Sequence, residues 1–400
     1  MKYLSKEEVI DRLRRYRFVK NQILEIIGGW VLSTPEVKIK IQYGRQLYSD
    51  ASHSDMLKQR LYHLGARTDD RQITYPAQKF ISYLEDIWRN ATRTSVRLYT
   101  IDVLLRSLLV DMIRQQLEQT SIPEDKGTEE ILRKIMSDDY ARISWANSAI
   151  VELAEQGEIL DDSVKQQLKE KLNQGGGFME SENPGVPFRK EFAYSRMPIR
   201  PGDWKIIEDP NDYAEKANTF DNVEGKRRLL HDLMDGELCS IERLGKMLAE
   251  FSELPWEMKL QLSKQAWDES RHAEAQIRRL KEFGGKVGDY PVNYWGWEVD
   301  VNRMDPLERL AISNMTFESE ACKHMNNWIE TARATGDEES ARLIEFILMD
   351  EVTHVQIGKR WVEELTKGEP EHYKKVMAYP ESVLQTIRPK GIKLDDLEQN

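Results

Sequence analysis

Cysteine is scarce in this sequence, with only Cys239 and Cys322 in 400 residues and no Cys-x-x-Cys pair. This scarcity excludes the disulfide framework of small secreted proteins and favours a reducing compartment. Long apolar runs are lacking too, since none approaches the ~20 residues of a membrane span. The first residues have no apolar signal-peptide core, and Ser5 with Glu8 instead predicts a helix capping box. We therefore expect a cytoplasmic protein with no membrane partner.

Positive charge is in deficit as well. Asp and Glu number 69 against 58 Lys and Arg, which gives a net charge of −11. Because an acidic protein does not attract a phosphate backbone, we expect no nucleic-acid partner. Runs of alternating β-branched residues are also missing, whereas apolar residues recur at three- and four-residue spacing through most of the chain. This pattern predicts an all-α protein.

Glycine and proline interrupt the helical pattern clearly at one place, between about residues 173 and 204. The interruption contains Gly175, Gly176 and Gly177, followed by Pro184, Pro187, Pro198 and Pro201. Such a stretch cannot continue a helix. We therefore predict a helical domain over 1–172, a linker over 173–204, a four-helix bundle over 205–368 and a tail over 369–400.

The bundle is predicted to contain four long helices, at about 225–251, 256–283, from Pro306 onward, and at about 338–365. Glycines after Phe283 suit a helix end, and Pro306 suits a first turn. An aromatic-rich connection, residues 286–305, separates the second helix from the third. Some metal-binding four-helix bundles have a long crossover at this position.

The two halves of the chain share spaced motifs. Asp50-x-x-His53 has the form of Glu269-x-x-His272, and the stretches that follow the two motifs match at the same constant offset. Asp139 with Arg142 parallels a later Glu-x-x-His motif. We interpret this as a duplicated bundle whose first copy has degenerated, the alternative being chance similarity of two amphipathic regions. Because Arg142 stands where a histidine would be needed, we expect the first copy to be metal-free, with Arg142 supplying the positive charge of a metal ion.

Acidic residues interrupt the apolar face of each predicted bundle helix. Carboxylates are rarely buried without a partner, and four in one core require cations among them. Two divalent ions would bring four positive charges to balance four negative ones. These four carboxylates are Glu237, Glu269, Glu318 and Glu351.

Two histidines complete the set of candidate ligands. Glu269-x-x-His272 and Glu351-x-x-His354 each place a carboxylate and an imidazole one turn apart on the same helix face. Two helices with Glu-x-x-His and two with a lone Glu are the ligand inventory of di-iron and di-manganese carboxylate bundles. The alternative is a polar core held by salt bridges, for which cationic residues on these faces are scarce.

Several nearby residues have open roles. Glu242 lies shortly after Glu237 and is either the ligand itself or a neighbour of the ligands. Asp268 and Asp350 either hold the outer histidine nitrogens, as carboxylates do at many metal sites, or lie on a solvated face. Cys322, one turn after Glu318, is expected to line the cavity as a packing residue rather than a ligand.

The region from about 196 to 365 resembles a largely uncharacterised family of the ferritin-like superfamily, grouped by a domain of unknown function. The resemblance implies a ferritin-like four-helix bundle with a di-metal site, and the superfamily includes oxygenases, desaturases, a tRNA hydroxylase and ferroxidases. Members often have histidine shortly before the first ligand, where this chain has Asp235. The matching motifs are Arg200-Pro201, Glu237-Leu-x-x-Ile-Glu242, Pro255-Trp256, Asp268-Glu269-x-x-His272, Phe283-Gly-Gly-Lys-Val-Gly-Asp-Tyr-Pro-Val, Thr316-Phe-Glu318 and Asp350-Glu351-x-x-His354.

These features together predict an O₂-activating di-iron oxidoreductase, an oxygenase or oxidase, that acts on a small organic substrate. Two iron ions are expected, with manganese as the alternative, and no catalytic residue beyond the metal ligands. Electrons would come from a ferredoxin, a flavin reductase or the substrate. Alternatives are a ferroxidase or iron-handling protein, a tRNA-hydroxylase-like enzyme, and a protein that keeps metal only for folding. Monomer and homodimer both remain open.

Overall fold

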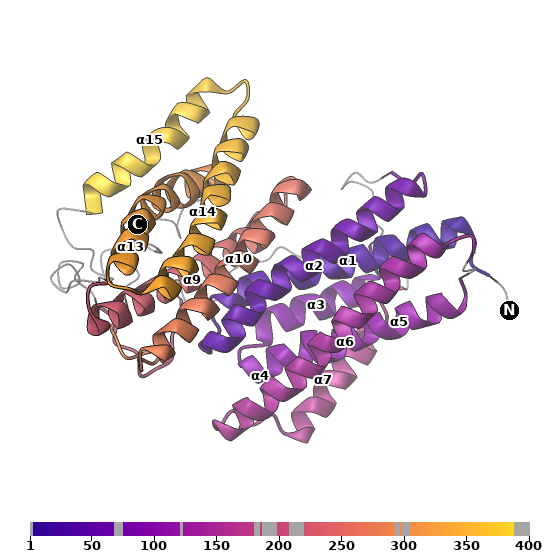
Figure 1. Ribbon diagram of the computed structural model, residues 1–400. Helices are drawn as coiled ribbons and strands as arrows, with labels where there is room; N and C mark the ends of the chain where they lie inside the picture. Colours follow the sequence, from indigo (N-terminus) through magenta and orange to yellow (C-terminus); the bar gives the residue numbers. More distant parts are fainter. Residues whose placement is uncertain are drawn as a thin grey trace. The chain divides into compact units, whose positions relative to one another are not determined.

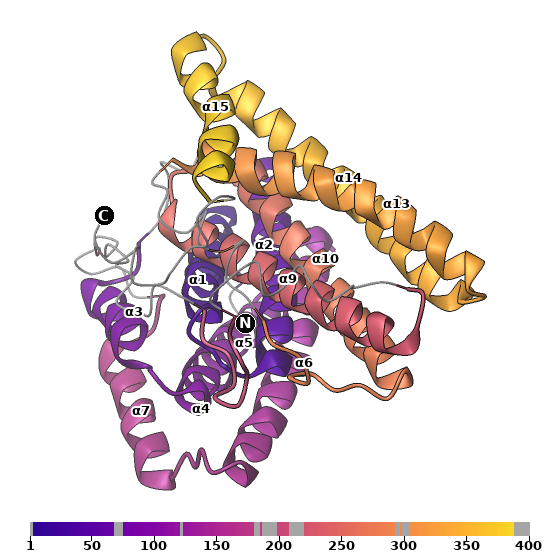
Figure 2. The same cartoon turned by 90° about the vertical axis from the view of Figure 1, so that its left-hand side faces the viewer.

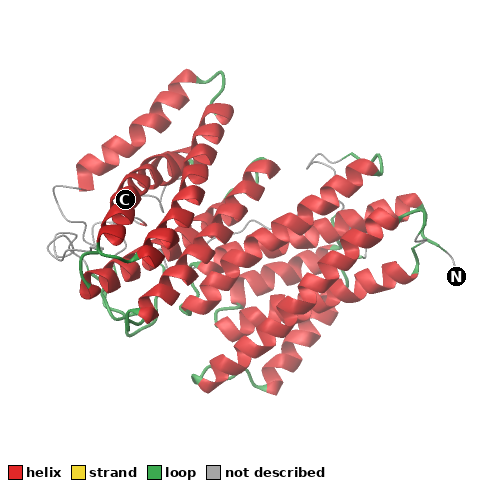
Figure 3. Ribbon diagram, viewed as in Figure 1, coloured by secondary structure: helices red, strands yellow, loops and turns green. Residues whose placement is uncertain are grey.

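A computed structural model describes residues 3–67, 75–120, 123–179, 185, 198–207, 220–292, 297 and 305–387 (Figure 1). The regular elements of these residues are helices, as Figure 3 shows, and the all-α prediction is confirmed. In the described ranges, no helix combines the length and the apolar character that crossing a membrane requires. Tyr294 and Trp295 of the predicted crossover, and residues 186–197 of the predicted linker, lie outside the described residues.

The chain divides into two compact units. The first comprises Met1–Ile27 and Ser49–Ala193, and the second comprises Gly28–Tyr48 and Tyr194–Asn400. Both divisions near the start fall inside helices, α1 (Lys6–Val31) and α2 (Val37–His63). Residues 28–48, which the sequence placed in the N-terminal domain, therefore group with the C-terminal residues. We call these the N-terminal and C-terminal units.

The N-terminal unit is built from parts of α1 and α2 together with five further α-helices and one π-helix among the described residues. Its third long helix is not regular, because a π-helix, η1, lies between two α-helical segments. In a π-helix the backbone hydrogen bonds span five residues instead of the four of an α-helix, and such segments occur frequently at functional sites. The elements are α3 (Gln78–Asn90), α4 (Thr94–Arg97), η1 (Leu98–Leu105), α5 (Arg106–Glu118), α6 (Lys126–Glu155) and α7 (Asp162–Gly175).

The C-terminal unit contains the four helices predicted for the bundle. The observed ends of the first, second and fourth lie close to the predicted ones. The third again contains a π-helix, η2, and the predicted tail contains an additional helix, α15. The elements are α9 (Val223–Glu250), α10 (Trp256–Glu282), α12 (Pro306–Leu310), η2 (Ala311–Phe317), α13 (Glu318–Ala334), α14 (Glu338–Leu365) and α15 (Pro370–Ile387).

Local sequence explains where these helices begin and end. The side chains of Asn222, Asp305 and Asp337 each accept a hydrogen bond from a backbone N–H in the first turn of α9, α12 and α14. Polar N-caps of this kind satisfy donors that the helix leaves unpaired. After α10, Gly284 has a φ of +78°, a conformation that residues with a side chain adopt rarely.

Helix pairs enclose the interior of the C-terminal unit. Figure 2 shows α13 beside α14 and α9 beside α10, and both pairs are in contact. Where Gly28 of α1 meets α9, a Cβ on Gly28 would lie 2.6 Å from the backbone oxygen of Gly245. A Cβ on Gly245 would lie 2.7 Å from the oxygen of Gly28. Glycine at both positions is therefore what allows the two backbones to touch.

Candidate metal centre

Each of the four long helices brings one glutamate to the interior of the C-terminal unit. Glu237 comes from α9, Glu269 from α10, Glu318 from the first turn of α13 and Glu351 from α14. None is more than 8% exposed. Four buried carboxylates in one place agree with the pattern that interrupted the apolar faces in the sequence.

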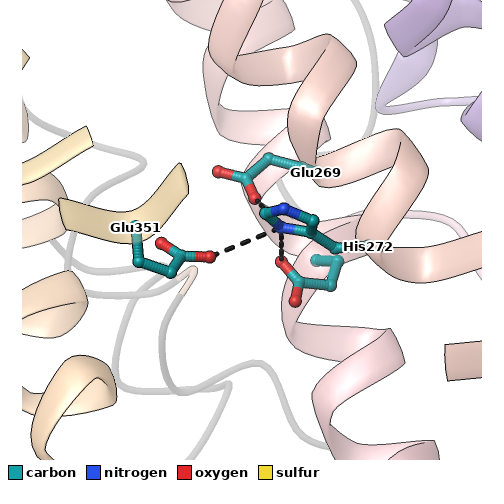
Figure 4. Close-up of side chains that lie close together, drawn as sticks. Glu269, His272 and Glu351 are labelled. Carbon is teal, nitrogen blue, oxygen red and sulfur yellow. Dashed lines mark hydrogen bonds and ion pairs between the residues drawn. The ribbon is translucent and has the colours of Figure 1, made fainter. Parts of the chain in front are cut away.

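Two histidines point their Nδ1 atoms at these carboxylates. Nδ1 of His272 lies 3.2 Å from Oε2 of Glu269, 3.4 Å from Oε1 of Glu351 and 3.8 Å from Oε2 of Glu237 (Figure 4). Nδ1 of His354 lies 3.2 Å from Oε2 of Glu351 and 3.4 Å from Oε1 of Glu269. Both histidines are at most 2% exposed.

The ligand atoms form two groups that share two members. One group consists of Glu237, Glu269, His272 and Glu351, and the other of Glu269, Glu318, Glu351 and His354, with all atoms of a group within 4.8 Å of one another. Atoms bound about 2.1 Å from a common ion lie roughly 3.0–3.4 Å apart. The observed nitrogen–oxygen distances are close to this range. The residues therefore fit two ions, and Glu269 and Glu351 are the members that the two groups have in common.

Side-chain amides assist the glutamates. Nε2 of Gln265 donates to Oε1 of Glu269 at 3.2 Å and to Oε1 of Glu318 at 3.3 Å. Nε2 of Gln276 donates to Oε1 of Glu237 at 2.8 Å. Amides orient a carboxylate without neutralising it, so these contacts leave the negative charge available to a cation.

The protonation of the cluster without metal reflects its surplus of negative charge. Burial raises the pKa of Glu237 to about 8. Burial and the charge of Glu351 raise the pKa of Glu318 well above its usual value. Burial alone would lower the pKa of His354, but the charge of Glu269 and contact with Asp268 raise it to about 10. Protons therefore take the place of metal charge when no ion is bound.

Asp268 and Asp350 each lie near the outer nitrogen, Nε2, of the histidine on the opposite helix. Nε2 of His272 on α10 lies 3.0 Å from Oδ2 of Asp350 on α14. Nε2 of His354 on α14 lies 3.5 Å from Oδ2 of Asp268 on α10. Arg271 contacts both aspartates. A carboxylate at the outer nitrogen fixes the ring and its tautomer, which leaves Nδ1 free to bind a metal.

Glu242 lies outside both groups of candidate ligands and is paired with cations instead. Its carboxylate contacts Nζ of Lys40 and Nη1 of Arg200, and all three side chains are buried. Arg200 also donates to Oδ1 of Asp235 at 2.9 Å and to Sγ of Cys239 at 3.3 Å. The sequence left Glu237 and Glu242 as alternatives, and only Glu237 lies in the cluster. Lys40 was missed because it belongs to a distant part of the sequence, near the start of α2.

A cavity of about 480 Å³ lies beside the cluster. The prediction that Cys322 lines this cavity is wrong, because Cys239 is on its wall and Cys322 is not. Three of the candidate ligands face the space, so a small molecule inside it would lie next to them. The walls comprise Glu237, Glu318 and Glu351 together with Asp232, Leu233, Asp235, Gly236, Cys239, Ser240, Arg243, Thr316, Phe317, Glu320, Ala321, His324, Met325 and Trp328.

Comparison with known proteins identifies the family but no activity. A family model described as "Protein of unknown function (DUF455)" matches residues 161–395. This match covers more than half of the chain and contains every candidate ligand. The chain belongs to the DUF455 family. No curated protein and no solved structure matched it.

Residues 1–160 lie outside the DUF455 match, but they contain a similar group. Asp50, His53 and Asp139 of the N-terminal unit also bring ligand-type atoms within 4.8 Å of one another. The cations in contact with the two aspartates are Lys20 and Arg106. The prediction that Arg142 supplies the positive charge here is therefore wrong.

Proposed function

We propose that the C-terminal unit is a ferritin-like di-metal bundle that uses two iron ions to activate O₂ and oxidise a small organic molecule. The observation that carries the proposal is the pair of buried four-residue groups that share Glu269 and Glu351. Two divalent ions would balance the charge of the four glutamates and remove the need for protons. Bound iron would supply the electrons and the open coordination positions that O₂ chemistry requires.

The residues divide this work in a definite way. Glu237 and His272 would hold one ion, and Glu318 and His354 would hold the other. Glu269 and Glu351, which belong to both groups, would contribute to both ions. Asp350 and Asp268 would fix the histidine rings by accepting their outer N–H groups. The cavity beside Glu237, Glu318 and Glu351 would admit O₂ and a small substrate. A ferredoxin or a flavin reductase would return electrons between turnovers, and manganese is the alternative metal.

Metal content is the direct test. Wild-type protein reconstituted with iron should contain about two ions per chain by mass spectrometry. Glu269→Ala/Glu351→Ala should contain none, because both shared ligands are lost. The matched control is Glu320→Ala, an exposed carboxylate on the cavity wall outside both groups, which should retain both ions. Circular dichroism must show that every variant is folded.

Wild-type protein that binds no metal after reconstitution would refute the site. If two ions bind, the loaded protein should consume O₂ faster than the same concentration of free ferrous iron. Uptake of many more than two ions per chain into a large assembly on size-exclusion chromatography would favour iron handling instead.

Loss of a histidine partner should weaken binding of metal without abolishing it. In Asp350→Asn, His272 loses the carboxylate that orients its ring, and we expect metal affinity to fall roughly 10- to 100-fold. Competition with a chelator of known affinity would measure the change. Glu363→Gln, an exposed position on the same helix, serves as control. An affinity in Asp350→Asn equal to that of the control would show that Asp350 has no such role.

A further inference from the structure

The long helices of the two units match in register. Lys20 stands as far from the first residue of α1 as Glu237 stands from the first residue of α9. Arg106 directly follows the π-helix η1, as Glu318 directly follows the π-helix η2. The positions of the two lone glutamates in the C-terminal unit are thus taken by cations in the N-terminal unit.

The remaining positions match as well. Asp50 and His53 are separated from the start of α2 by the same distances along the chain that separate Glu269 and His272 from the start of α10. Asp139 stands at the same position in α6, counted from its first residue, as Glu351 does in α14. The N-terminal unit therefore keeps carboxylates at the positions of the shared ligands.

The two cations occupy every oxygen of these carboxylates. Nζ of Lys20 donates to Oδ1 of Asp50 at 2.9 Å and to both oxygens of Asp139 at 2.7 and 2.9 Å. Nη1 of Arg106 donates to Oδ1 of Asp50 and to Oδ1 of Asp139, both at 2.8 Å. Nη2 of Arg106 donates to Oδ2 of Asp50 at 2.6 Å. The four side chains are at most 1% exposed. Nε of Arg106 also donates to Oδ1 of the buried Asp102 at 2.9 Å, and burial raises the pKa of Asp102. Lys20 and Arg106 thus supply two positive charges to Asp50 and Asp139.

The histidine and its outer partner are also retained. Nε2 of His53 lies 2.9 Å from Oδ2 of Asp138, just as His272 contacts Asp350 in the other unit. Burial and the charge of Lys20 lower the pKa of His53, so the ring is neutral at pH 7. The arrangement of a metal site is present, but its centre is filled by an ammonium and a guanidinium group.

We infer that the N-terminal unit contains an ionic replica of the metal centre, in which Lys20 and Arg106 do the charge balancing that metal ions do in the C-terminal unit. The likeness to a metal centre rests on the proposed function, whereas the ion pairs do not. An ion approaching Asp50 and Asp139 would have to displace buried cations that already use all four oxygens. This unit should therefore fold and persist without metal, although its aspartate–histidine group resembles a ligand set.

The metal part of the inference is tested in the full chain. Glu269→Ala/Glu351→Ala, reconstituted separately with iron, manganese and zinc, should bind no ion at all. About one ion per chain that disappears when Asp50→Asn/Asp139→Asn is added would overturn the inference and leave the proposed function intact. If reconstituted wild-type protein bound no metal, the proposed function would be refuted. The ion-pair variants described next would then decide the inference by themselves.

The ion pairs are tested by removing one charge and then its partner. Lys20→Met leaves Asp50 and Asp139 with Arg106 alone, which also pairs with the buried Asp102. We expect the folding equilibrium constant of the N-terminal unit to fall roughly a hundredfold or more. Lys20→Met/Asp139→Asn restores the charge balance and should recover at least tenfold. Hydrogen exchange of the α6 amides in the full chain measures both, with and without chelator. No recovery in the double variant would show that Lys20 contributes packing rather than charge, and loss of α6 protection in chelator would show that metal is needed.

Discussion

Removing the metal ions is expected to reverse the pH dependence of stability in the C-terminal unit. In the metal-free protein, burial raises the pKa of Glu237 to about 8, and Glu269 with Asp268 helps to raise the pKa of His354 to about 10. Groups with a raised pKa stabilise the folded state while they are protonated. Their contribution is complete below the unfolded pKa values, near 4.5 and 6.5, and is lost as pH rises through 8 and 10.

The metal-bound protein should behave in the opposite way. Ligands must be deprotonated to bind, so metal binding strengthens as pH rises over the same interval. Between pH 6 and 8 we expect the free energy of unfolding of the metal-free protein to fall by about 4 kcal/mol, roughly 2 kcal/mol from each group, while that of the loaded protein rises.

Denaturant unfolding of chelated and of reconstituted protein at several pH values would measure how the free energy of unfolding changes with pH in each form. Hydrogen exchange of α10 and α14 amides would assign the change to the C-terminal unit. Slopes of the same sign in the two forms would contradict a carboxylate–histidine metal centre, even if metal were found in the protein by mass.

The contact between Gly28 and Gly245 predicts the second large effect. In Gly245→Val, a side chain would enter a gap in which even a Cβ would lie 2.7 Å from a backbone oxygen. Neither backbone can rotate out of the way as a side chain can, so the two helices would have to separate. We expect a loss of about 3 kcal/mol or more in the free energy of unfolding. Thermal or denaturant unfolding followed by circular dichroism would measure it.

The matched control lies on the same helix. A Cβ on Gly236 of α9 would meet no atom within 4 Å. Gly236→Ala should therefore be neutral or stabilising by up to about 1 kcal/mol, because alanine favours a helix more than glycine does. If Gly245→Val were as stable as Gly236→Ala, the two backbones would not be in contact in solution.

The sequence predicted the helices of the C-terminal unit closely because their signals are local. Apolar spacing, proline at a first turn and glycine after Phe283 act within a few residues of each helix end. The candidate ligands were found for a similar reason, since a glutamate inside an apolar face is visible within one turn. What each helix meets across the core cannot be read from such local patterns.

The points that the sequence left open, and the one at Arg142 that it predicted wrongly, concern contacts between distant segments. Glu242 looked as suitable a ligand as Glu237 until Lys40 and Arg200 proved to pair with it. Asp268 and Asp350 each lie beside a candidate ligand glutamate in the sequence, yet each reaches the histidine of the other helix. In the N-terminal unit, Arg142 was predicted to supply the positive charge because it stands where the histidine of a Glu-x-x-His motif would be. Counting from the helix starts would have pointed to Lys20 instead.

The two π-helices bear on the order in which this chain acquired its parts. A π-helix arises when one residue is inserted into an α-helix, and η1 and η2 occupy the same place in the third helix of each unit. If the two units arose by duplication of one bundle, a single insertion before the doubling accounts for both π-helices, whereas insertion afterwards would have had to happen twice at one site. The cations at positions 20 and 106 occur in one unit alone. On that interpretation the irregular helix is older than the doubling, and the difference between the units at positions 20 and 106 is younger than both.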